Sequence, residues 1–277
     1  MTAPAEYAVG AEGLSALRAA IGVQTWPAVL DEPPTGDEAR PAGDEPADRD
    51  GPTDEIPWWL AESLRVLANP SCHIEIRTVD DSRGDIERTC VAAGPGRVVA
   101  ATATRRCGDG MTTMFRDLGT PADLVRDGPA VLAAAVRRYF GDAATPAFGS
   151  VTAPRDHVVD ILRHAAGLED TALREAVADG LRRLCADDHR ARSAAAFATA
   201  GRRSEIVAYA AAGAVRTRSS GAVGIFECAG GRIIASAADA ADGRLWTTLS
   251  PGTGHRIEQS VTLLLEPLHG LIAAGAH

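Results

Sequence analysis

Two histidines and one cysteine–histidine pair are the residues whose spacing suggests chemistry. His157 and His164 lie seven residues apart in a predicted helix, so they share one side of it at a separation of two turns. That separation is too long for one metal ion without further ligands. Cys72 and His73 are adjacent on a predicted strand, where neighbouring side chains point to opposite faces. A thiol–imidazole dyad would need another histidine, so we predict neither a metal site nor a catalytic cysteine.

The glycine-containing turns do not match the known phosphate-binding loops. Gly252-Thr253-Gly254 precedes a predicted helix, but a P-loop needs a lysine and the sequence has none. Gly94-Pro95-Gly96 joins two predicted strands and lacks the third glycine of a dinucleotide fingerprint. No serine lies in a GxSxG elbow. Because no acid, base and nucleophile come together, we predict no catalytic, cofactor or metal site. A degenerate enzyme using Cys72 or Cys228 stays an alternative.

The charge of the protein is concentrated in one segment. Between Asp31 and Glu55 there are ten carboxylates and two arginines, which accounts for most of the net charge of -9. The remainder is close to neutral, so general nucleic-acid binding is not expected. Five scattered cysteines form no CxxC pair, and neither a secretory signal nor an apolar run of membrane-spanning length is visible. These features predict a soluble cytoplasmic protein without membrane insertion.

Hydrophobic periodicity and turn residues divide the chain into helices and strands. We predict helices at 12–21, 58–68, a region from about 120 to 140 with a break at Gly128-Pro129, 155–166, 170–184, 187–199 and 254–272, the last interrupted at Pro267. In the helix at 58–68, Trp58 is assigned to the apolar side. We predict strands at 74–80, 86–93, 205–212 and 221–228, with a basic turn or edge at 216–220. The acidic, proline-rich segment 31–57 cannot bury enough apolar surface to fold and is predicted to be a flexible loop.

One stretch of sequence occurs twice. Residues 96–114 and 231–249 match without a gap at an offset of 135, so that Val98-Val99 align with Ile233-Ile234. Each copy predicts a β-hairpin that extends back by one strand. We therefore predict a single domain over 1–277 with related halves at 7–142 and 143–277. The fold class is α+β, with an antiparallel central sheet, continuous or back-to-back, built from two quasi-symmetric halves and flanked by helices and helical bundles.

Three short sequence segments resemble those of the EspG family, the cytosolic chaperones of type VII (ESX) secretion systems. They are GVQTWPAVL at 22–30, SLRVLANP at 63–70 and DGRLWTTLSP at 242–251, and they run in the order of the family. The resemblance covers residues 12–275. It implies a central antiparallel sheet with two quasi-symmetric halves, and a non-catalytic role without cofactors. Its implied partner is a secreted PE–PPE-like helical heterodimer, bound through the tip of the PPE subunit and kept soluble for secretion.

Two departures from the family leave the identity of the client open. The acidic segment 31–57 is long, and residues 180–203 are fuller than the usual connection into the C-terminal strands. A homodimer is also left open. The alternative from another functional class is an α+β protein that binds a small apolar ligand between sheet and helices.

The resemblance does not transfer contact positions residue by residue, so the chemistry of the side chains selects the candidates. Arginine, tyrosine and apolar residues near a sheet edge suit a docking helix. The partner-binding candidates are Arg202, Glu205, Ile206, Tyr209, Arg216 and Arg218, together with Arg105 and Arg106 in the first-half turn. Ile206 and Tyr209 could equally belong to the core, and Trp246 is assigned to the core.

Overall fold

The computed structural model describes residues 5–30, 56–94, 97–105, 110–119, 128–185, 187–212, 215–240, 243–268 and 270. The first-half elements are β1 (Glu6–Gly10), α1 (Ala11–Ile21), η1 (Ala28–Leu30), α2 (Trp58–Ala68), β2 (Cys72–Asp80), β3 (Asp85–Gly94), β4 (Arg97–Arg105), β5 (Met111–Gly119) and α3 (Gly128–Phe140). The second-half helices are α4 (Arg155–His164), α5 (Asp170–Cys185), α6 (Asp188–Ala194), η2 (Ala195–Thr199), α7 (Gly254–Leu265) and η3 (Glu266–Leu268). The second-half strands are β6 (Val151–Pro154), β7 (Arg202–Ala212), β8 (Val215–Arg218), β9 (Val223–Cys228), β10 (Gly231–Asp239) and β11 (Leu245–Pro251).

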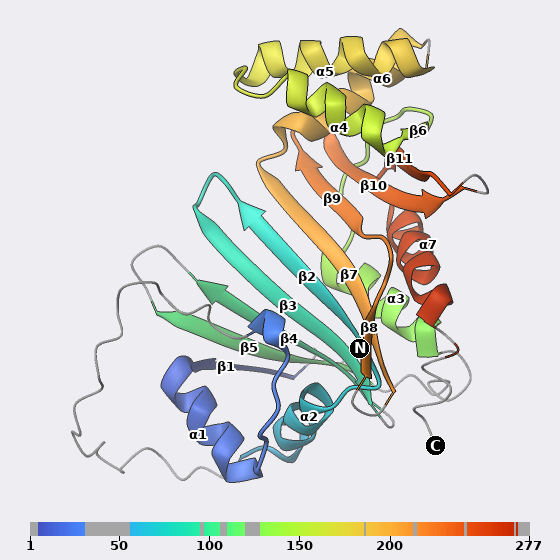
Figure 1. The fold of residues 1–277 in the computed structure, drawn as a ribbon. Helices are drawn as coiled ribbons and strands as arrows, with labels where there is room; N and C mark the ends of the chain where they lie inside the picture. Colours follow the sequence, from blue (N-terminus) through green and yellow to red (C-terminus); the bar gives the residue numbers. More distant parts are fainter. Residues whose placement is uncertain are drawn as a thin grey trace.

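The eleven strands found among the described residues join one antiparallel sheet (Figure 1). Its order is β1-β5-β4-β3-β2-β7-β9-β10-β11-β6, and β8 pairs with the end of β7. The central pair, β2 and β7, joins the two halves, with Ile76 opposite Ile206. Within the described residues no helix is long and apolar enough to cross a membrane.

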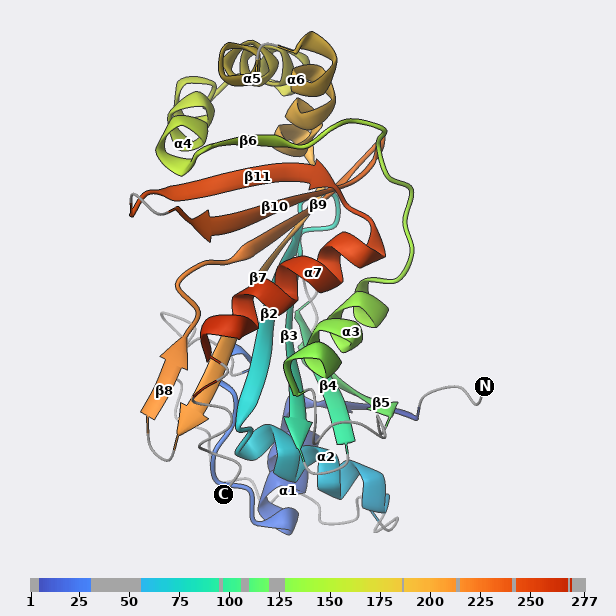
Figure 2. The ribbon, with the colours of Figure 1, turned by 90° about the vertical axis from the view of Figure 1, so that its right-hand side faces the viewer.

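Helices cover the two faces of the sheet in different ways. Helices α3 and α7 pack against each other and lie across one face, which we call the α3/α7 face (Figure 2). On the opposite face, α1, η1 and α2 cover the first half, and α4, α5, α6 and η2 cover the second half (Figure 1). Residues of β2 and β7 alternate between the faces, so Ile74, Ile76, Ile206 and Ala208 enter the α3/α7 core. The helices on the opposite face therefore pack in two separate hydrophobic clusters, one on each half of the sheet.

The strand order is symmetric about the β2–β7 pair, which confirms the predicted sheet of two quasi-symmetric halves. Strands β5-β4-β3-β2 on one side correspond to β11-β10-β9-β7 on the other, and β1 and β6 close the two edges. Ala101 pairs with Phe115 in the first half, and Ala235 pairs with Leu249 in the second. Structurally equivalent residues on these strands are thus 134 positions apart.

The sequence repeat, aligned at 135, is out of register with this symmetry by one residue. Val99 packs in the α1–α2 cluster, whereas its aligned partner Ile234 packs in the α3/α7 core. Because strand side chains alternate with a period of two, a shift of one residue moves each side chain to the other face. The repeat correctly predicted the two hairpins, but residues aligned at an offset of 135 are not the ones that occupy equivalent positions in the sheet.

The aligned arginines of the repeat consequently hold different helices. Arg97 donates a hydrogen bond to the carbonyl oxygen of Trp59 on α2 at 3.0 Å, and its guanidinium lies 4.6 Å from the centre of the Trp58 ring. Arg232 donates to the carbonyl oxygens of Phe140 and Gly141 at 2.9 and 3.0 Å, where α3 ends. A cation at that position also complements the helix dipole.

Several element boundaries differ from the sequence prediction. The edge strands β1 and β6 were not predicted, because each is short and pairs with only one neighbour. Trp58, assigned to the apolar side of α2 together with Leu64 and Leu67, is 71% exposed, whereas Leu64 and Leu67 are buried as predicted, and Leu60 is buried with them. The 120–127 part of the predicted helical region and residues 31–55 of the predicted loop lie outside the described residues.

Loss of the Arg232 side chain should destabilise the fold strongly. Arg232 is 4% exposed and also pairs with Glu227 at 2.8 Å, so Arg232→Ala leaves one carboxylate and two carbonyl oxygens without their donor. We expect the free energy of unfolding to fall by about 2–3 kcal/mol, measured by urea denaturation. The exposed Arg163→Ala should change it by about 0.5 kcal/mol or less. Equal effects of the two variants would contradict the assigned role of Arg232.

Candidate docking groove

A groove of about 530 Å³ lies on the opposite face, in the second half of the sheet. Residues from β2, β7, β9, β10 and β11 line it, together with Arg155 at the start of α4. We call this hollow the docking groove.

Small residues form the floor of the docking groove. The registers place Gly224 opposite both Glu205 and Ala235, and Ala237 follows on the same side of β10. A Cβ atom on Gly224 would lie 2.9 Å from the ring of Phe226, which itself packs edge-on against Phe197. The Phe226 ring therefore lies against Gly224, and a larger residue at this position would have to displace it.

The equivalent positions in the first half are covered by the chain itself. Gly224, Ala235 and Ala237 correspond to Cys90, Ala101 and Ala103, which are 0%, 0% and 2% exposed. The turn η1 packs on β3 and β4 there, and its Val29 and Leu30 share a cluster with these residues. The second-half positions are all partly exposed. The docking groove is thus the open counterpart of a site that a helical turn fills.

The rim of the groove mixes apolar and charged groups. Val79 is 38% exposed, although it lies on a central strand. Arg77 stands opposite Glu205 across the β2–β7 pair, and Arg203 forms an ion pair with Asp81 at 2.7 Å. An apolar centre with a polar, arginine-containing rim is typical of reversible protein–protein interfaces.

The structure separates the predicted β7 candidates by sheet face. Glu205 lines the docking groove. Ile206 is 0% exposed in the α3/α7 core, so it cannot contact a partner in this conformation. Arg202 lies on that same face and pairs with Glu87 at 2.6 Å, outside the groove. Strand alternation explains this split, because neighbouring residues of β7 cannot face one partner together.

The other candidates lie beyond the groove. Tyr209 is half-buried on the opposite face, where Arg218 stands across from it on β8, and Arg216 lies further along that strand. Arg105 is exposed at the end of β4. Arg106 lies outside the described residues. None of the four described residues lines the docking groove.

Sequence reasoning missed several lining residues, among them Arg77, Val79, Arg155, Arg203 and Phe226. Arg203 and Phe226 share their face with Glu205, so alternation along one strand could have indicated Arg203. Arg77 and Val79 enter the site only because β2 pairs with β7. No local pattern encodes that long-range pairing.

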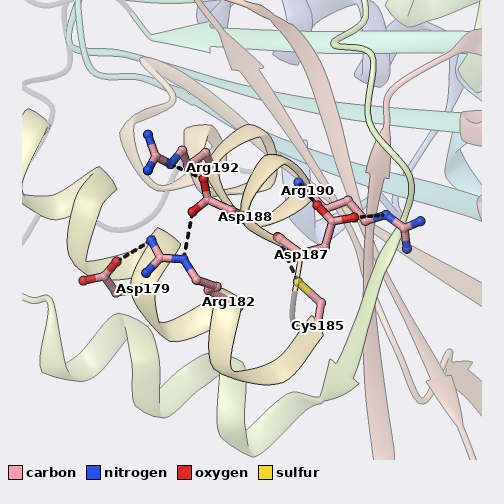
Figure 3. A network of polar contacts seen from close by, with 7 residues as sticks. All are labelled: Asp179, Arg182, Cys185, Asp187, Asp188, Arg190 and Arg192. Atoms are coloured by element: carbon pink, nitrogen blue, oxygen red, sulfur yellow. Dashed lines mark hydrogen bonds and ion pairs between the residues drawn. The ribbon is translucent and has the colours of Figure 1, made fainter.

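An ion-pair network connects helices α5 and α6 (Figure 3). Arg182 on α5 contacts Asp179 at 2.7 Å and Asp188 on α6 at 2.8 Å, and Arg192 contacts Asp188 at 2.9 Å. Asp187 caps α6 by accepting a hydrogen bond from the backbone N–H of Arg190. Partial desolvation raises the pKa of Asp188, but hydrogen bonds from Arg192 and Arg182 outweigh it and hold that pKa below its ordinary value. These exposed pairs orient α5 against α6 and weaken with salt.

Three of the described cysteines have raised thiol pKa values, and the described residues contain no cluster of potential metal ligands. Burial raises the pKa of Cys72 to about 12 and that of Cys228 to about 11, and it also raises the pKa of Cys90. No group of three or more potential metal ligands occurs among the described residues. A raised thiol pKa is the reverse of what a nucleophilic cysteine needs.

Thiol alkylation tests this reading directly. In the native protein at pH 7.5 we expect Cys72 and Cys228 to react with iodoacetamide far more slowly than a free peptide thiol, because the reactive thiolate is scarce below the raised pKa. Denaturant should bring both rates to the peptide value. Mass spectrometry of labelled peptides reports each site. Rapid labelling of either native cysteine would restore the degenerate-enzyme alternative.

Three comparisons place the chain among known proteins. The model of the EspG family matches residues 11–262. No curated protein matches the sequence. Among solved structures, the chain is similar to one titled as the Mycobacterium tuberculosis type VII secretion system chaperone EspG5 in complex with the PE25-PPE41 dimer. That match has a TM-score of 0.67 and 15% identity, and it covers 95% of this chain and 96% of the other. At this identity, the similarity establishes a shared fold.

Proposed function

This chain belongs to the EspG family, and we propose that it is a non-catalytic, cytoplasmic secretion chaperone. Its client is the helical tip of a PE–PPE-like pair, which it holds in the docking groove and keeps soluble for type VII secretion. The open groove is the observation that carries this proposal, because the same position in the first half is filled by a helical turn. A helix-in-groove complex would cover apolar surface that otherwise drives aggregation.

Two further observations support a protein client. The similar solved structure is titled as a chaperone in complex with a PE–PPE dimer. The groove is bordered by charged residues from β2, β7 and α4, and its floor is only partly buried. Small-molecule sites enclose most of their ligand between apolar walls, so these features favour a protein segment over the alternative of a small apolar ligand.

Co-purification tests the function. The tagged chain is recovered from a native actinobacterial lysate, and its partners are identified by mass spectrometry. We expect a PE–PPE-like pair in near-equal amounts with the chain. Recovery of the chain alone, or with only a low-mass ligand, would contradict the chaperone role.

A charge placed at Val79, the apolar side chain of the rim, should weaken client binding. Val79→Glu introduces a carboxylate that must lose water when a partner covers it, so we expect the dissociation constant to rise about tenfold. Leu263→Glu is the matched control, because Leu263 is 52% exposed on α7 at the α3/α7 face. Isothermal titration with the co-purified pair measures both. Equal weakening by the two variants would place the client elsewhere.

A further inference from the structure

Three alternate residues of β2 form a row that runs from the protein interior to the docking groove. His73, Glu75 and Arg77 point to the opposite face of the sheet, because residues two apart on a strand share a face. His73 is 2% exposed and Glu75 is 6% exposed, whereas the Arg77 side chain is 61% exposed and lines the groove. The row therefore connects two buried titratable groups with an exposed cation.

Among the described residues, His73 has no hydrogen-bond partner at either ring nitrogen. Its ring stacks on Tyr209 with the centroids 5.0 Å apart, and its Nε2 atom lies 3.6 Å from Oε1 of Glu75. Burying an unpaired polar group costs free energy, and most buried polar atoms in proteins are satisfied. Packing alone gives no reason for a histidine here.

Glu75 lies between the His73 imidazole and the Arg77 guanidinium without a close hydrogen bond to either. Its Oε2 atom is 3.7 Å from Nη2 of Arg77, and its Oε1 atom is 3.6 Å from His73. Both distances exceed the usual length of a hydrogen bond. A small rotation of the carboxylate could close one contact at the expense of the other.

The internal symmetry shows that this arrangement is particular to the first half. Glu75 stands opposite Cys90, and Glu205 stands opposite Gly224, so the two glutamates are structurally equivalent. By the same registers His73 corresponds to Arg203. In the second half the permanently charged arginine is exposed and pairs with Asp81. In the first half a titratable group occupies the equivalent position in a buried site.

The strands around the row carry the other ionisable groups that face it. On β3, Cys90 and Arg88 stand opposite Glu75 and Arg77. On β7, Tyr209 and Glu205 stand opposite His73 and Arg77, and β8 adds Arg218 across from Tyr209 and Arg216 across from Ala211. The turn η1 over β3 and β4 contributes no ionisable side chain. Among these side-chain types, imidazole is the one that commonly exchanges a proton near neutral pH.

We propose that His73 and Glu75 are positioning residues that control, through Arg77, how strongly the docking groove binds a client carboxylate. This rests on the proposed function. With His73 neutral, Glu75 pairs with Arg77 and offsets its charge. When His73 takes up a proton, Glu75 pairs with the imidazolium and Arg77 is released toward the groove. Acidification then strengthens binding of a client helix that carries a carboxylate beside its apolar tip.

Binding measurements at two pH values test the coupling with the co-purified PE–PPE pair. We expect wild type to bind about fivefold more tightly at pH 6.0 than at pH 7.5, and His73→Gln to lose that ratio. Glu75→Gln should bind tightly at both pH values, because Arg77 is no longer offset. Arg77→Gln should bind weakly at both, and Arg83→Gln, an exposed turn variant, should behave like wild type.

A merely structural role of the row would not produce this pattern. The same pH ratio in wild type, His73→Gln and Arg77→Gln would overturn the proposal. Because Arg77 is largely exposed, Arg77→Gln decides the question even where a variant at the buried positions fails to fold.

Nuclear magnetic resonance gives a test without the client. The Nε–Hε resonance of Arg77 should shift between pH 7.5 and 6.0 in wild type and stay still in His73→Gln. An unmoved resonance in wild type would overturn the coupling. Absence of any PE–PPE binding at either pH would instead contradict the proposed function, so the two failures are distinguishable.

Discussion

The pairing of β2 with β7 is the constraint on which the rest of the structure depends. It joins strands that lie more than a hundred residues apart in the chain, and its nine residue pairs run from Cys72–Ala210 to Asp80–Arg202. Ile76 and Ile206 meet near its middle, both fully buried beneath α3 and α7. The register also decides which residues reach the opposite face. A one-residue shift of β7 against β2 would turn Glu205 toward the α3/α7 core and Ile206 toward the groove, so core and groove are determined together.

Local patterns predicted much of the fold, and the limits of the prediction have physical causes. The helices at 12–21 and 58–68 were predicted within one residue of α1 and α2, because an apolar stripe and a terminating glycine or proline are local signals. The repeat predicted both hairpins and the two-half sheet. Its alignment at 135 differs from the structural offset of 134, because small residues such as the alanines on β4 and β10 make neighbouring registers look alike. Edge strands β1 and β6 form through contacts on one side only, which leaves little trace in sequence.

The candidate site was harder to predict than the fold. Glu205 was identified, but its neighbour Ile206 belongs to the core and Arg202 to the far face. Residues from β2 and α4 complete the groove, and only tertiary pairing brings them there. The two halves differ in which residues cover the opposite face of the sheet. Trp26 and Leu30 cover the first half as part of its core, whereas the small residues at Gly224 and Ala235 stay partly open. The two halves of the sheet share one strand order, but η1 fills the site in the first half, and the equivalent site in the second half forms the docking groove.

The central claim is that the client occupies the docking groove, and site-specific photo-crosslinking addresses it most directly. A benzophenone side chain is placed at Glu205 in the groove or at Leu263 on the α3/α7 face, and each protein is irradiated with the PE–PPE pair. The account predicts a covalent adduct with the PPE subunit from position 205 and none from position 263. An adduct from position 263, with none from 205, would show that the client binds the α3/α7 face and would contradict the account.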